Sequence, residues 1–117
     1  MIISTILGEI SLADAHISRI VLEHDYIVVE FVDWKERACS LVFNEMLGME
    51  LCGPLHPDLS HIIVDEHDSF IAKCRHVADG NMKELAGNCF SIYSVDSNVP
   101  MIKIVARTAH ATVHDQL

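Results

Sequence analysis

The chain has 117 residues, of which half are hydrophobic and about a fifth are charged, so we expect one folded domain over residues 1–117 and exclude an intrinsically disordered chain. Seventeen acidic and eight basic side chains give a formal net charge of −9 at pH 7, which disfavours direct binding to nucleic acid or to an anionic membrane. No apolar run approaches the roughly 20 residues of a membrane-spanning helix, and four cysteines without a C-x-x-C pair indicate reduced thiols in a cytoplasmic protein.

The N-terminal half of the chain predicts an antiparallel β-meander. Residues 2–10 form the first expected strand, and the β-branched run at 17–22 forms the second. Apolar side chains then alternate along 26–34 and again from residue 39, with a three-residue polar break before each run. The buried face of these two strands is expected to carry Ile27, Val29, Phe31, Cys39, Leu41 and Phe43.

The middle of the chain has a less regular pattern. Apolar side chains alternate from Leu47 to Leu51, but Gly48 interrupts them. This predicts a kinked or bulged continuation of the third strand, which ends at Gly53-Pro54 because proline cannot donate a ladder hydrogen bond. A short apolar run follows at residues 59–64.

One helix is expected at about residues 69–79. Asp68 or Ser69 caps its first turn and Gly80-Asn81 ends it. The apolar side of this helix carries Phe70, Ile71, Cys74 and Val77.

The C-terminal part predicts a β-hairpin between residues 88–95 and 101–108. Residues 109–117 show little pattern and are expected to fray. Together, these elements predict an α+β fold that is mostly β: an antiparallel meander sheet, one helix and a C-terminal hairpin.

The stretch from Ala38 to Ala72 contains no Lys or Arg but carries six carboxylates. An acidic surface of this kind favours basic protein partners or cations. The first group of candidate partner-binding residues is therefore Glu45, Glu50, Asp58, Asp65, Glu66 and Asp68.

A second candidate surface lies on the strand expected at 26–34. Tyr26, Glu30 and Trp34 alternate on the face opposite its buried side chains. Trp and Tyr are enriched among residues that anchor protein interfaces. These three residues therefore form the second partner-binding candidate, although a tryptophan at a strand end also suits the core.

Histidine and carboxylate side chains offer an alternative chemistry. His56, His61 and Asp65, with His67 beside them, are the residue types that bind Zn²⁺ and similar ions. They match no tight metal motif, no phosphate-binding loop is present, and no nucleophile motif is visible. We therefore expect no metal, no cofactor and no enzymatic activity, and a small metal-binding or hydrolytic domain using His56, His61 and Asp65 is the alternative.

The motif F-V-D-W-K-E-R at residues 31–37, with L-V-F at 41–43 and L-S-H at 59–61, resembles small β-rich bacterial proteins. Small acidic domains of this sort are also similar to the immunity proteins of bacterial toxin systems, including contact-dependent inhibition. The resemblance covers residues 16–107 and supplies no catalytic residues. It implies a protein that binds one cognate basic toxin, such as a nuclease, and occludes its active surface. A third possibility is a homodimeric module joined by a sheet edge or by the face that carries Tyr26 and Trp34.

Overall fold

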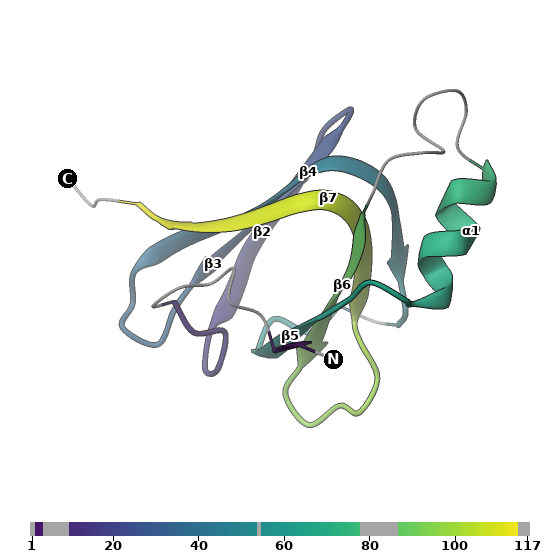
Figure 1. Ribbon diagram of the computed structural model, residues 1–117. Helices are drawn as coiled ribbons and strands as arrows, with labels where there is room; N and C mark the ends of the chain where they lie inside the picture. Colours follow the sequence, from purple (N-terminus) through teal and green to yellow (C-terminus); the bar gives the residue numbers. More distant parts are fainter. Residues whose placement is uncertain (1, 4–9, 54, 78–86, 115–117) are drawn as a thin grey trace.

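The computed structural model describes residues 2–3, 10–53, 55–77 and 87–114, which form one curved β-sheet and one helix (Figure 1). The elements in chain order are β1 (Ile2–Ile3), β2 (His16–Leu22), β3 (Tyr26–Val32), β4 (Ala38–Leu51), β5 (Leu59–Asp65), α1 (Ser69–Val77), β6 (Asn88–Ser94) and β7 (Ile102–Val113). Every pairing between neighbouring strands is antiparallel, in the order β1-β5-β6-β7-β4-β3-β2. The expected α+β, mostly β fold is confirmed.

The two longest strands, β4 and β7, pair over nearly their whole lengths at the centre of the sheet. On one side of this pair lie β3 and β2, and on the other lie β6, β5 and β1. The sheet curls so that its two sides face each other across a common interior (Figure 1). The meander of β2, β3 and β4 and the hairpin of β6 and β7 are both as predicted.

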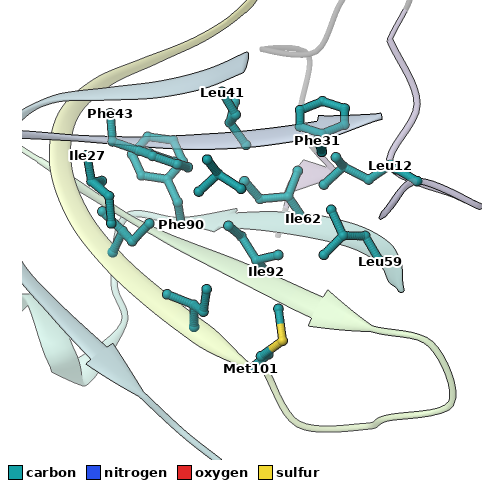
Figure 2. Close-up of a cluster of buried hydrophobic side chains, with 14 of the residues drawn as sticks. Leu12, Ile27, Phe31, Leu41, Phe43, Leu59, Ile62, Phe90, Ile92 and Met101 are labelled. Carbon is teal, nitrogen blue, oxygen red and sulfur yellow. The ribbon is translucent and has the colours of Figure 1, made fainter. Parts of the chain in front are cut away.

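The main hydrophobic core fills the concave side of the sheet (Figure 2). All six side chains predicted for the inner face of β3 and β4 are buried there. They pack against Leu59 and Ile62 of β5 and Ile92 of β6. The rings of Phe43 and Phe90 meet edge to face with centroids 5.2 Å apart, which joins the two sides of the sheet.

A bulge bends β4 where the sequence predicts a kink. The register with β7 shifts between Met46 and Gly48, and Glu45 takes a left-handed conformation with φ of 53°. Gly48 is needed there because α1 passes close to the strand. A Cβ atom at residue 48 would lie 2.5 Å from Cys74 Sγ.

Helix α1 packs on the convex face of the sheet over β6 and β7, and leaves the convex face of β2 and β3 uncovered among the described residues. Its side chains Ile71 and Cys74 pack with Cys89 of β6 and Val105 of β7 in a second, smaller hydrophobic cluster. Asp68 caps the helix, because its Oδ1 accepts a hydrogen bond of 2.9 Å from the Phe70 N–H. The predicted start of the helix is confirmed, and its predicted end at about residue 79 lies outside the described residues.

Two boundaries predicted from the sequence are wrong. Residues 109–113 do not fray, because they continue β7 and pair with β4, with Val113 opposite Cys39. The strand expected over 26–34 ends at Val32, so Trp34 lies in the turn that follows. The pattern of 109–113 alternates small and polar side chains, and only the pairing with β4 reveals it as a strand.

The first expected strand, residues 2–10, is present as β1 at Ile2–Ile3, which pairs with β5. Residues 4–9 lie outside the described part, and Ile10 is buried in the core without belonging to a strand. Among the described residues, no helix has the length and apolar character needed to cross a membrane.

Candidate functional site

The acidic residues of the 38–72 stretch meet basic side chains that come from elsewhere in the chain. Three of the carboxylates form ion pairs with Lys or Arg of α1 or β7. These pairs are Glu45–Arg107 at 3.2 Å, Glu50–Lys73 at 3.7 Å and Asp68–Lys103 at 3.1 Å. The negative charge at these three positions is therefore locally balanced, which the sequence pattern did not indicate.

The Asp68–Lys103 pair is the least exposed of the three. Burial raises the pKa of Asp68, but the Phe70 N–H and the Lys103 ammonium outweigh this effect and lower the pKa below its usual value. Asp68 thereby acts as both helix cap and tether between α1 and β7. Its surroundings indicate a structural role.

The other three carboxylates of this group lie at opposite ends of β5. Asp58 precedes the strand and Asp65 ends it, so they are separated by about 23 Å of extended chain. Asp58 pairs with His16 at 3.0 Å, and Glu66 pairs with His67 at 3.4 Å. The six carboxylates therefore do not form one continuous acidic surface.

The second predicted surface lies on the convex face of β2, β3 and β4. Tyr26, at the start of β3, is 37% exposed. Glu30 receives two hydrogen bonds from Arg19, at 2.8 Å and 3.0 Å, which lower the pKa of Glu30 and raise that of Arg19. The negative charge of Glu30 at the centre of this face is therefore balanced by Arg19 of the neighbouring strand β2.

A row of valine side chains lies next to this ion pair on the same face. Val28 lies directly opposite Val21 on one side and Val42 on the other, and all three are half-buried. Residues opposite each other in antiparallel strands project from the same face of a sheet. Because α1 packs over the other half of the convex face, this valine row stays uncovered among the described residues.

Trp34 is the most exposed aromatic side chain of the described residues, with 58% of its surface accessible. The Lys35 ammonium lies 5.1 Å from the centre of its ring. The sequence left open whether this residue belongs to the core or to an interface. The structure places it on the surface, in the turn between β3 and β4.

The turn that carries Trp34 is held by the buried side chain of Asp33. Asp33 Oδ1 accepts hydrogen bonds from the backbone N–H groups of Lys35, at 3.1 Å, and Arg37, at 2.8 Å. Asp33 Oδ2 accepts a further bond of 2.8 Å from Arg37 Nε, and Glu36 completes the turn with φ of 62°. Burial opposes ionisation of Asp33, but the bonds and charge of Arg37 outweigh it and lower the pKa.

The histidines and carboxylate of the alternative metal site are not brought together. His61 stacks on Tyr93 with ring centroids 4.4 Å apart, and His56 Nδ1 accepts a hydrogen bond from the Asp58 N–H. Asp65 lies four residues beyond His61 along β5, which corresponds to about 13 Å. In the part of the chain that the structure describes, no group of three or more His, Cys, Asp or Glu is arranged to hold a metal ion.

The four cysteines are free thiols. Cys39, Cys74 and Cys89 are buried, whereas Cys52 is exposed. Cys74 and His76 lie on different sides of α1, because Cys74 is buried and His76 is exposed. They do not form a nucleophile–base pair.

One further group of exposed side chains was not singled out from the sequence. Four of the large hydrophobic side chains that are exposed lie in or beside the β4–β5 and β6–β7 loops: Leu51, Leu55, Val95 and Val99. The available signal was the presence of apolar residues in two loops that contain no Lys or Arg. Whether those two loops meet depends on the curvature of the sheet.

Comparison of the chain with protein-family models, curated proteins and solved structures finds no match. The function is therefore argued from the geometry of the described residues.

Proposed function

We propose that this protein is a binding module for another protein, with Trp34 as the anchor of the interface. The observation that supports this proposal is a largely exposed tryptophan on a turn that Asp33 holds in one conformation. A large apolar side chain costs free energy when it faces water, and a fixed turn reduces the entropy lost on binding. Both features suit an interface anchor.

The convex face beside Trp34 has the composition of an interface centre. It presents half-buried valines, an exposed tyrosine and an Arg19–Glu30 ion pair whose charges cancel. Interface centres are depleted in net charge and enriched in Trp, Tyr and Arg. From Tyr26 to Val32 this face extends about 20 Å along β3, which suits an interface of standard size.

The chemistry of the proposed partner follows from the net charge of −9. A chain with this excess of carboxylates attracts basic proteins over long distances and accelerates their association. In this proposal the protein is a cytoplasmic immunity protein. Its partner is a basic toxin, such as a nuclease, and binding covers the toxin surface that contacts phosphate.

The proposal is tested by capturing the partner from a lysate of the source organism and then measuring its affinity with purified components. Replacing Trp34 with alanine should weaken binding at least tenfold, whereas Trp34→Phe should retain most of the affinity. An unchanged dissociation constant for Trp34→Ala would remove Trp34 from the interface. Raising the salt concentration should slow association if charge attraction steers the partner.

A homodimeric module remains the second candidate, because β2 is an edge strand and the face beside it is uncovered. The charge of −9 on each copy opposes self-association, so we expect a monomer of 13.1 kDa by light scattering. A dimer that Trp34→Ala dissociates would assign this face to a second copy.

A further inference from the structure

We infer that the basic partner also docks on the loop end, which is the end of the molecule formed by the β4–β5 loop, the β6–β7 loop and the residues before β2. This inference rests on the proposed function, and it names the surface whose negative charge attracts the basic partner. The residues that define the loop end are Leu51, Leu55, Val95, Val99, Asp14, Asp58 and Asp96.

Hydrogen bonds hold the two loops of this end side by side. The Cys52 N–H donates to the Met101 carbonyl at 2.9 Å, and the Val95 N–H donates to the Asp58 carbonyl at 3.1 Å. The His56 N–H lies 3.0 Å from Met101 Sδ, which places the β4–β5 loop against the end of the β6–β7 loop. The two loops that carry the exposed apolar side chains therefore lie next to each other.

The residues before β2 belong to the same surface. The Leu59 N–H donates to the Ala15 carbonyl at 2.9 Å, and the Ile17 N–H donates to the Pro57 carbonyl at 2.8 Å. These bonds join the start of β2 to the start of β5. They bring Asp14 to the end of the molecule that carries Asp58.

The loop end carries three exposed aspartates and no Lys or Arg. None of the segments that build it, residues 11–18, 51–60 and 94–102, contains Lys or Arg. Asp14, Asp58 and Asp96 are exposed there, and His16 is the ion-pair partner of Asp58. In contrast, Glu45, Glu50 and Asp68 each lie beside a Lys or Arg.

The loop end lies next to the β3–β4 turn that carries Trp34. Val32, two residues before Trp34, pairs with His16 across β3 and β2. His16 in turn contacts Asp58 at 3.0 Å. One partner can therefore contact the tryptophan and the acidic loops at the same time.

The exposed side chains of the loop end favour one kind of binding partner. Exposed leucine and valine side chains with aspartates beside them match a protein surface that carries Lys and Arg around an apolar centre. A second copy of this chain is disfavoured, because its own aspartates would face those of the first copy.

The test is NMR mapping on the ¹⁵N-labelled full chain with a defined probe, the amidated peptide Lys-Leu-Lys-Lys-Leu-Lys. The expected result is saturable shift changes that concentrate at residues 51–58 and 94–100. The peptide Glu-Leu-Glu-Glu-Leu-Glu, which has the opposite charge, should produce none. Shift changes centred on Glu45, Glu50 and α1, or the absence of saturable binding, would overturn the inference.

Matched variants test whether peptide binding depends on the aspartates of the loop end or only on the net charge of the protein. Asp14→Asn with Asp96→Asn removes two charges and suits the backbone, because both residues have φ near 60° and asparagine tolerates that conformation. This pair should weaken peptide binding at least fivefold, as should Val99→Ser. The control pair Glu23→Gln with Asp25→Asn removes the same charge in the β2–β3 turn, at the far end of β2, and should leave binding unchanged within twofold.

The same variants distinguish this inference from the proposed function. If the purified partner loses affinity with Trp34→Ala but not with the Asp14 and Asp96 pair, the loop end is not part of the interface and the proposed function stands. If no protein partner is captured, the proposed function fails, and the peptide mapping still decides whether the loop end binds cationic, apolar chains.

Discussion

The buried carboxylate of Asp33 binds both the backbone and the guanidinium of Arg37, four residues later in the same turn. The two hydrogen bonds are each 2.8 Å long, and the Asp33 side chain has no exposed surface. This contact determines the shape of the β3–β4 turn. It thereby determines where Trp34 meets solvent.

Replacing Asp33 with alanine should destabilise the fold by about 1–3 kcal/mol, because partly buried N–H groups of the turn and the Arg37 guanidinium lose their acceptor. Urea denaturation followed by circular dichroism measures this change. Trp34→Ala is the control, and because its side chain is exposed it should change the free energy of unfolding by no more than about 0.5 kcal/mol. An Asp33→Ala variant as stable as the wild type would show that the turn does not depend on this carboxylate.

Acid should destabilise the protein through Asp33 and Asp68. Both have a lower pKa in the folded state than the usual value of 3.8, so their stabilising effect is present above that value and is lost as the pH falls below it. Denaturation midpoints measured between pH 2 and pH 6 should fall most steeply at the acid end. In Asp33→Asn this fall should be shallower, and an identical pH profile would argue against the assignment.

Gly48→Ala should destabilise the protein by about 1–3 kcal/mol, because the added methyl group meets Cys74 Sγ at 2.5 Å and α1 must move. Cys74→Ala removes that sulfur, and the next side-chain atom, Cys74 Cβ, is 3.6 Å away. The double variant should therefore lose less stability than the sum of the two single variants. Additive losses would mean that α1 does not pack on Gly48 as the structure shows.

Thiol labelling at pH 8 should modify Cys52 alone in the folded protein. Cys39, Cys74 and Cys89 are buried, and burial, together with the Asp68 charge, raises the pKa of Cys89 to about 11. Cys52 should react more slowly than a free thiol, because partial burial and the neighbouring Glu50 raise its pKa as well. Mass spectrometry after timed labelling counts the modified thiols, and two or more rapidly labelled cysteines would contradict this prediction.

Hydrogen exchange should show that the C-terminal half of β7 is a hydrogen-bonded strand. In the described part of the chain, residues 108–113 pair with β4 on one side only, because β6 begins at Asn88, opposite Ala106. Alternate amides of 109–113 should therefore be protected while the amides between them exchange quickly. Exchange of all five at the rate of an unfolded peptide would support the fraying that the sequence pattern suggested.

The sequence was sufficient to predict the elements whose signal is local. The alternation of Ile27, Val29 and Phe31 defines an inner face, and Asp68 before Phe70 and Ile71 defines the start of a helix. The bulge near Gly48 was also predictable, because a glycine interrupts an alternating run. These features depend on backbone geometry within a few residues.

Tertiary structure decided which charges are balanced and which side chains are exposed. Glu45 meets Arg107, 62 residues away, only because β4 pairs with β7. Trp34 is exposed because Asp33 closes the chain into a turn two residues after the end of β3. The loop end exists because the curled sheet brings the start of β2 to the start of β5, as the His16–Asp58 contact shows. Local patterns specify strands and faces, but pairings between distant residues follow from the packing of the whole sheet around one core.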